Sequence, residues 1–180
     1  RRDRSRELQG RRSGLDAGPV LAHVYVDEHA QGDPGRCGGT GTSRFALGYE
    51  AITDVQPGSY AVMDAQYGAV EGLGFGYALT VLATVISVRG SVAILDAGYK
   101  SLSDDAGPPR LLAGSGTFTF AGDEFGKLTA GSNAVPGVGD KVRLIPGHCD
   151  TTINLHDEYV VHRAQGVIDR WPIVARGKSR

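Results

Sequence analysis

The residues best suited to chemistry lie in one stretch near the C-terminal end of the sequence, Pro146–Asp157. Its last ten residues contain two histidines, one cysteine and two aspartates. On an extended segment residues i and i+2 face the same side, so His148 and Asp150 are predicted to converge while Cys149 points away. A neutral imidazole beside a carboxylate forms half of a divalent-metal site. The alternative is a polar loop whose side chains cap a turn.

Two such ligands are too few for a closed structural zinc site, which takes four. A metal bound by His148 and Asp150 alone would keep open coordination positions, as catalytic metals do. The pair therefore favours a catalytic over a structural role for any bound ion.

A second stretch that could take part in binding or catalysis is the glycine-rich run Cys37–Thr42. Closely spaced glycines let backbone N–H groups approach an anion, and a threonine hydroxyl adds a donor. This pattern predicts a phosphate-binding loop, with a flexible turn as the alternative.

Composition and charge limit the class of protein. The 180 residues suffice for one ordinary domain, and the 27 glycines are typical of a turn-rich β protein. A net charge of -1 offers no footprint for nucleic acid, and the arginine-rich start is expected to be a solvated terminus. No apolar run is long enough for a membrane-spanning helix. Two cysteines in different motifs suggest a reducing compartment, and we expect a cytoplasmic protein.

The elements that would position these residues are mostly strands. Residues 79–88 and 91–97 predict a hairpin around Arg89-Gly90. A second hairpin is expected over 158–163 and 167–174, with Trp171 packed in the core. Further strands are predicted at 20–26, 117–120, 127–129 and 141–145. The pattern indicates a mainly β, antiparallel protein.

Several motifs together resemble a known family. Pro146–Asp157, Cys37–Thr42, the segment 53–64 and Asp96–Ser103 are similar, in order, to motifs of the D-threonine aldolase and D-serine dehydratase family. These are pyridoxal-phosphate enzymes of the alanine-racemase-like fold. The resemblance implies a C-terminal antiparallel β domain, barrel- or sandwich-like, preceded by the last one or two strands of a truncated (β/α)₈ barrel.

The resemblance also implies a division of the chain and a set of sites. Residues 1–36 are a poorly defined segment, 37–64 a remnant of the barrel, and 65–177 the β domain. His148 and Asp150 correspond to the family's metal ligands. The dehydratases carry cysteine two places after the histidine, where this chain has Asp150, and a carboxylate favours manganese or magnesium, with zinc as an alternative. The residues implied to hold the phosphate of pyridoxal phosphate are Gly38, Gly39, Thr40, Gly58 and Ser59.

The implied reaction is cleavage of a small D-β-hydroxy-α-amino acid, such as D-threonine, to glycine and an aldehyde. His156 is a candidate for the base or for support of the site, with a hydrogen-bonded loop residue as the slightly favoured alternative. Two other functions stay open: D-serine dehydration to pyruvate and ammonia, and a non-catalytic metal-binding or interaction module.

Family members also carry a cofactor lysine upstream of anything present in this sequence. Lys100 does not match it and is predicted to lie at the surface or in an ion pair. We therefore expect the chain to be a C-terminal fragment that is inactive alone. The resemblance implies a homodimer for the full-length parent.

Overall fold

The computed structural model describes residues 35–178 except 133 and 165. The chain divides into two compact units, Arg1–Gln56 and Pro57–Arg180, which are described separately. The boundaries expected at 36/37 and 64/65 stay predictions, and the strand expected at 20–26 lies outside the described residues.

The described part of the first unit, residues 35–56, contains one short helix and one parallel contact. Helix α1 (Ser43–Ala46) directly follows the glycine-rich loop. Arg36 and Asp54 form an isolated parallel bridge, and Gln56 N–H donates to the carbonyl of Gly38 at 2.9 Å. Parallel pairing is the arrangement of neighbouring strands in a (β/α)₈ barrel, so this bridge is compatible with the predicted barrel remnant.

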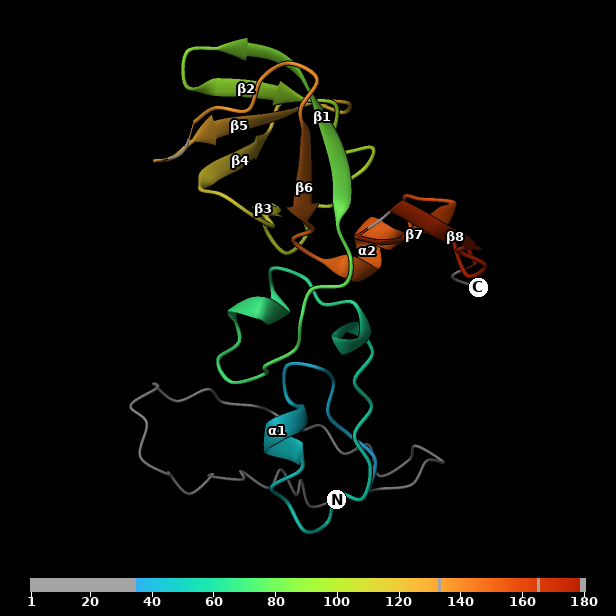
Figure 1. Ribbon diagram of the computed structural model, residues 1–180. Coiled ribbons are helices and arrows are strands. Elements are labelled where there is room, and N and C mark those ends of the chain that lie inside the picture. The colour runs from blue at the N-terminus through green and yellow to red at the C-terminus, as the bar shows by residue number, and fades with distance from the viewer. Residues whose placement is uncertain (1–34, 133, 165, 179–180) are drawn as a thin grey trace, which may run out of the picture. The chain divides into compact units, whose positions relative to one another are not determined.

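The second unit is built on a six-stranded antiparallel sheet (Figure 1). The strands occur in the order β3-β6-β1-β2-β5-β4. The two edge strands come together, because a Cβ placed on Gly116 of β4 would lie 3.3 Å from Leu111 of β3. The sheet is thus a nearly closed barrel, and the predicted mainly β fold is confirmed. Its strands are β1 (Val81–Arg89), β2 (Val92–Leu95), β3 (Arg110–Leu111), β4 (Gly116–Phe120), β5 (Gly126–Ala130) and β6 (Lys141–Ile145).

The longer strands bury one face of the sheet, because successive side chains of a strand point to opposite sides. Ala83 and Val85 alternate with more exposed neighbours in β1, and Val142 and Leu144 do the same in β6. The predicted first hairpin is confirmed, with Arg89 opposite Val92. The buried cluster at the barrel centre comprises Ala83, Val85, Ala93, Leu95, Ala97, Leu102, Phe118, Leu128, Val142 and Leu144.

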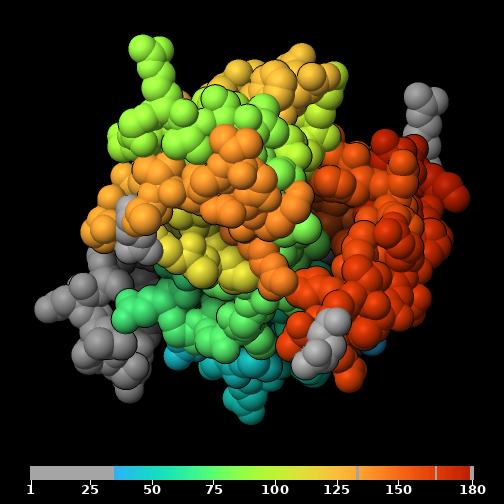
Figure 2. Space-filling view, turned by 45° about the horizontal axis from the view of Figure 1, so that its top comes forward, coloured from blue at the N-terminus to red at the C-terminus, as the bar shows by residue number. Residues whose placement is uncertain are grey.

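The second predicted hairpin is also present, as β7 (Glu158–Arg163) and β8 (Gly166–Pro172). It forms a separate two-stranded sheet, red in Figure 2. The expectation that Trp171 packs in the core was wrong: its side chain is 54% exposed, and its indole N–H donates to Asp169 at 2.7 Å. A two-stranded sheet has no buried interior of its own, and every residue of β8 is exposed.

The remaining elements are single helical turns. They are the 3₁₀ turns η1 (Ser59–Ala61) and η2 (Tyr67–Ala69) and helix α2 (Cys149–Ile153). Within the described ranges, every helix is too short or too polar to cross a membrane.

Tight packing of Phe118 on Gly126 makes this glycine a test of the barrel core. A Cβ at Gly126 would lie 2.2 Å from Phe118 and 2.6 Å from the carbonyl oxygen of Ala97. We expect Gly126→Ala to lower the free energy of unfolding by about 1–3 kcal/mol, since overpacking displaces the ring. Urea denaturation measures this. Gly76→Ala, where a Cβ meets nothing within 4 Å, is the control; equal losses in both variants would contradict the packing.

Candidate functional site

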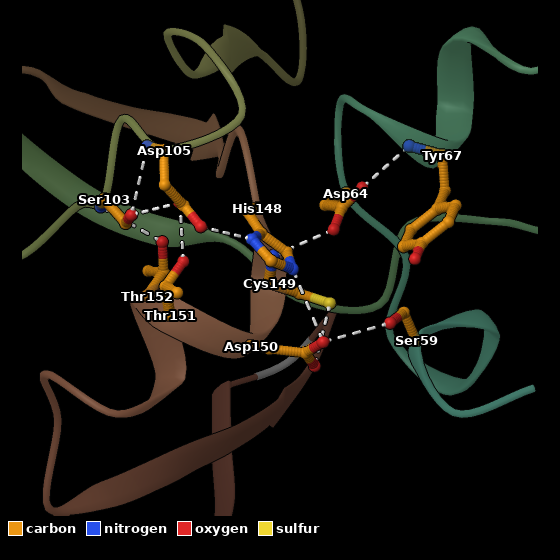
Figure 3. A network of polar contacts seen from close by, with 10 residues as sticks. All are labelled: Ser59, Asp64, Tyr67, Ser103, Asp105, His148, Cys149, Asp150, Thr151 and Thr152. Carbon is orange, nitrogen blue, oxygen red and sulfur yellow. Dashed lines mark hydrogen bonds and ion pairs between the residues drawn. The ribbon is translucent and has the colours of Figure 1, made fainter. Parts of the chain in front are cut away.

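The stretch rich in histidine and aspartate lies where a strand passes into a helix. Strand β6 ends at Ile145, His148 is extended with φ -134° and ψ 126°, and α2 begins at Cys149. The expectation of an extended segment was therefore wrong beyond His148. The predicted convergence nevertheless occurs, because the first turn of α2 brings the Asp150 side chain back towards His148. His148 Nε2 and Asp150 Oδ2 lie 3.4 Å apart (Figure 3).

Gly147, just before His148, permits a close approach of two backbone segments. A Cβ at this position would lie 1.9 Å from the carbonyl oxygen of Gly107. Such a contact is impossible for any residue with a side chain unless the backbone moves. The glycine therefore lets the loop that precedes β3 lie directly against the end of β6.

That loop carries Asp105, which sequence reasoning missed. Its Oδ2 lies 2.6 Å from His148 Nδ1, so the imidazole stands between two carboxylates, Asp105 and Asp150. Asp105 could not be linked to His148 from the sequence, because 43 residues separate the two and no spacing rule connects them. Its place two residues after the Asp96–Ser103 motif was the only available signal.

Three hydrogen bonds fix the Asp105 carboxylate. The hydroxyl of Ser103 donates to it, Thr151 Oγ1 donates at 2.8 Å, and His148 is the third partner. Burial by itself would raise the pKa of Asp105, but these bonds outweigh it and lower the pKa to about 2. Burial disfavours the imidazolium of His148, yet the hydrogen bond and charge of Asp105, with the charges of Asp150 and Asp64, raise the His148 pKa.

A buried carboxylate, Asp64, holds the start of α2. It is 0% exposed and accepts backbone N–H groups from Tyr67 and Cys149, each at 2.8 Å. The Cys149 N–H is one of those that a helix start leaves without a partner inside the helix. In addition, Ala65 N–H donates to the carbonyl of Pro146 at 2.9 Å. The segment around Asp64 therefore fixes the strand-to-helix junction from a second side.

Cys149 is a buried thiol rather than a ligand. Burial, with a hydrogen bond to Asp64 and nearby negative charge, raises its pKa to about 12. Metals and electrophiles react with the thiolate, and the raised pKa of the buried Cys149 disfavours that form at neutral pH.

Asp150 is the open member of the site. Its side chain is 65% exposed, and Ser59 Oγ donates to its Oδ2 at 3.3 Å. Ser59, a predicted phosphate ligand, thus contacts a predicted metal ligand. The carboxylate is restrained on one side and accessible to solvent on the other.

The other predicted residues occupy separate places. Gly38, Gly39 and Thr40 lie in the first unit, whereas Gly58 and Ser59 begin the second. His156 Nε2 donates to the carbonyl of Ser101 at 2.9 Å, the contact expected of a hydrogen-bonded loop residue. Lys100 is exposed and pairs with Glu124 at 2.8 Å, as predicted.

His148 and Asp150 fit two ligands of one ion. With metal–ligand distances of about 2.1 Å, neighbouring ligands lie about 3.0–3.4 Å apart, and the observed separation is 3.4 Å. In the described part of the chain, no group of three His, Cys, Asp or Glu residues is arranged to hold a metal. The open coordination positions expected for an ion bound by His148 and Asp150 stay a prediction.

The sequence of the chain is similar to one family model and to proteins named as aldolases. The family model for a putative serine dehydratase domain matches residues 78–162. A D-threonine aldolase of Arthrobacter sp is 45% identical over 150 residues, which are 79% of this chain and 39% of that protein. A 3-hydroxy-D-aspartate aldolase of Paracoccus denitrificans is 39% identical over 152 residues, with the same coverage.

The fold agrees with these matches. The crystal structure of D-threonine aldolase from Filomicrobium marinum superposes with a TM-score of 0.74 at 33% identity, over 81% of this chain and 42% of that one. The chain thus spans about two-fifths of the length of these relatives. It belongs to the D-threonine aldolase and D-serine dehydratase family, of which it matches the C-terminal portion.

Proposed function

We propose that this chain supplies the metal-binding part of a lyase that depends on pyridoxal phosphate and a divalent metal. The reaction is cleavage of a D-β-hydroxy-α-amino acid to glycine and an aldehyde. The observation that carries the proposal is that His148 Nε2 lies 3.4 Å from Oδ2 of Asp150, whose carboxylate is accessible to solvent. Both relatives compared in sequence are aldolases by name, and both are at least 39% identical to this chain.

Each residue then has a defined task. When bound, the metal would lower the pKa of the substrate β-hydroxyl, and pyridoxal phosphate would withdraw electrons from the α-carbon. His148 and Asp150 each offer one lone pair to the metal, and Ser59 restrains the Asp150 carboxylate. Gly38, Gly39 and Thr40 of the first unit remain candidates for holding the cofactor phosphate, and Gly58 and Ser59 of the second unit are separate candidates.

The identity of the second ligand favours an aldolase over a D-serine dehydratase. Asp150 occupies the position at which the dehydratases carry cysteine, and the adjacent Cys149 is buried and neutral. An oxygen ligand favours manganese or magnesium over zinc. Dehydration of D-serine is the alternative outcome of the test.

The test is a chimera in which the matched part of the Arthrobacter D-threonine aldolase is replaced by residues of this chain. We expect it to convert D-threonine to glycine and acetaldehyde in the presence of Mn²⁺. His148→Ala and Asp150→Ala should each lower kcat/KM at least about 100-fold, because each removes one of two protein ligands.

The control is His162→Ala, a histidine of β7 outside the site. Its activity should match that of the unmodified chimera. Pyruvate released from D-serine without cleavage of D-threonine would contradict the aldolase assignment. Unchanged Mn²⁺ affinity in both ligand variants would instead favour a non-catalytic interaction module.

Metal binding should depend on pH through His148. A metal requires the neutral imidazole, and the pKa of His148 is raised, so protons compete with metal up to a pH above 6.5. We expect the apparent Mn²⁺ affinity of the 180-residue protein to rise about tenfold per pH unit below that pKa and to level off above it. Electron paramagnetic resonance of free Mn²⁺ measures the affinity. An affinity that stays constant between pH 5 and 7 would exclude His148 as ligand.

His156 stays a candidate for the base or for support of the site, and the structure restricts any proton transfer to one atom. Since Nε2 donates to Ser101, only Nδ1 is available to accept a proton. Because glutamine preserves the donor and removes the base, His156→Gln in the chimera separates the two roles. We expect activity within tenfold of the parent chimera, as for a supporting residue. A loss of about 100-fold or more with unchanged Mn²⁺ affinity would establish proton transfer.

A further inference from the structure

We propose that Asp105 is a positioning residue that fixes the imidazole of His148, so that Nε2 is presented to the metal beside Asp150. That His148 is held for the sake of a metal rests on the proposed function. The contact itself, 2.6 Å between Asp105 Oδ2 and His148 Nδ1, belongs to the chain alone.

The hydrogen bonds of Asp105 determine which tautomer His148 adopts. Asp105 accepts hydrogen bonds from two hydroxyls, of Ser103 and Thr151, and faces the imidazole with its other oxygen. An ionised carboxylate is acceptor-only, so His148 Nδ1 must carry the hydrogen. The lone pair of the neutral ring then lies on Nε2, which is the atom that faces Asp150. Metal-ligating histidines are commonly held in this way by a carboxylate on the far ring nitrogen.

The Asp105 carboxylate is itself held by a residue next to the second predicted ligand. Thr151, one of its donors, follows Asp150 directly on α2. Asp105 therefore contacts one predicted ligand and the neighbour of the other (Figure 3). Ser103 N–H also donates to Thr152 Oγ1 at 3.2 Å, which ties the same loop to the same helix. Rotation of the imidazole and displacement of α2 are thereby restricted by one carboxylate.

The effect of contact with the imidazole can be separated from the effect of a nearby negative charge. Asp104 carries the same charge one residue away, but its side chain is hydrogen-bonded to Tyr99, whereas Asp105 is the carboxylate bonded to His148 Nδ1. Asp104→Asn removes the same charge as Asp105→Asn without touching the imidazole. The two variants therefore form a matched pair that separates contact from long-range electrostatics.

The experiment uses the 180-residue protein and two readouts. Long-range ¹H–¹⁵N spectra of the metal-free protein, above the His148 pKa, report which ring nitrogen carries the hydrogen. Titration with Mn²⁺, followed by electron paramagnetic resonance, gives the affinity. We expect wild type and Asp104→Asn to show the Nδ1–H form of His148 and affinities within about twofold of each other.

Asp105→Asn should populate the Nε2–H form and lower the Mn²⁺ affinity about 10- to 100-fold, the range found for such partners of metal ligands. Circular dichroism and urea denaturation establish whether the variant is folded. Should it fail to fold, Thr151→Val provides the second arm, since it removes one restraint and keeps the carboxylate. This variant should give a smaller loss of affinity and partial appearance of the Nε2–H form.

An unchanged tautomer and affinity in Asp105→Asn, or in Thr151→Val where that arm is used, would overturn the positioning role. Failure of wild type to bind Mn²⁺ would contradict the proposed function instead. The tautomer measurement needs no metal, so it still decides whether Asp105 fixes His148. The two failures are therefore distinguishable.

Discussion

The contact between the His148 imidazole and the Asp105 carboxylate is the interaction on which the candidate site depends. It joins the end of β6 to the loop that precedes β3, and through Thr151 it includes α2. A charge-assisted hydrogen bond of this kind is about twice as strong as a neutral one, and it sets direction as well as distance. Since both segments are anchored on the barrel, the ring orientation derives from the sheet rather than from a free loop.

Burial separates the roles of the three adjacent residues in His148-Cys149-Asp150. The histidine is partly accessible, the cysteine is buried and the aspartate is largely exposed. A strand-to-helix junction produces this division, because it turns successive side chains in different directions over a short distance. The buried Asp64 supplies the acceptor that the junction requires for the Cys149 N–H. Chemistry at the surface is thus supported by a polar group within the protein.

Much of the fold could be predicted from the sequence, and part of the site could not. A run rich in valine, isoleucine and threonine and the Arg89-Gly90 turn predicted the first hairpin, because β-branched residues favour strands and the turn is local. The convergence of His148 and Asp150 was predicted for the wrong reason, since α2 replaces the expected strand. Asp105 was missed because its partner is distant in the sequence, and Trp171 was misplaced because alternation alone does not show whether a second layer covers a strand.

The close approach at Gly147 has a consequence for redesign of ion preference. With no space for a methyl group beside the Gly107 carbonyl, position 147 accepts a side chain only if the backbone moves. In the proposed metal site the donor atom at position 150 can be exchanged for a softer or harder one, whereas a side chain at position 147 would displace the segment that carries it. Ion preference in that site would therefore be easier to change through ligand chemistry than through this part of the backbone.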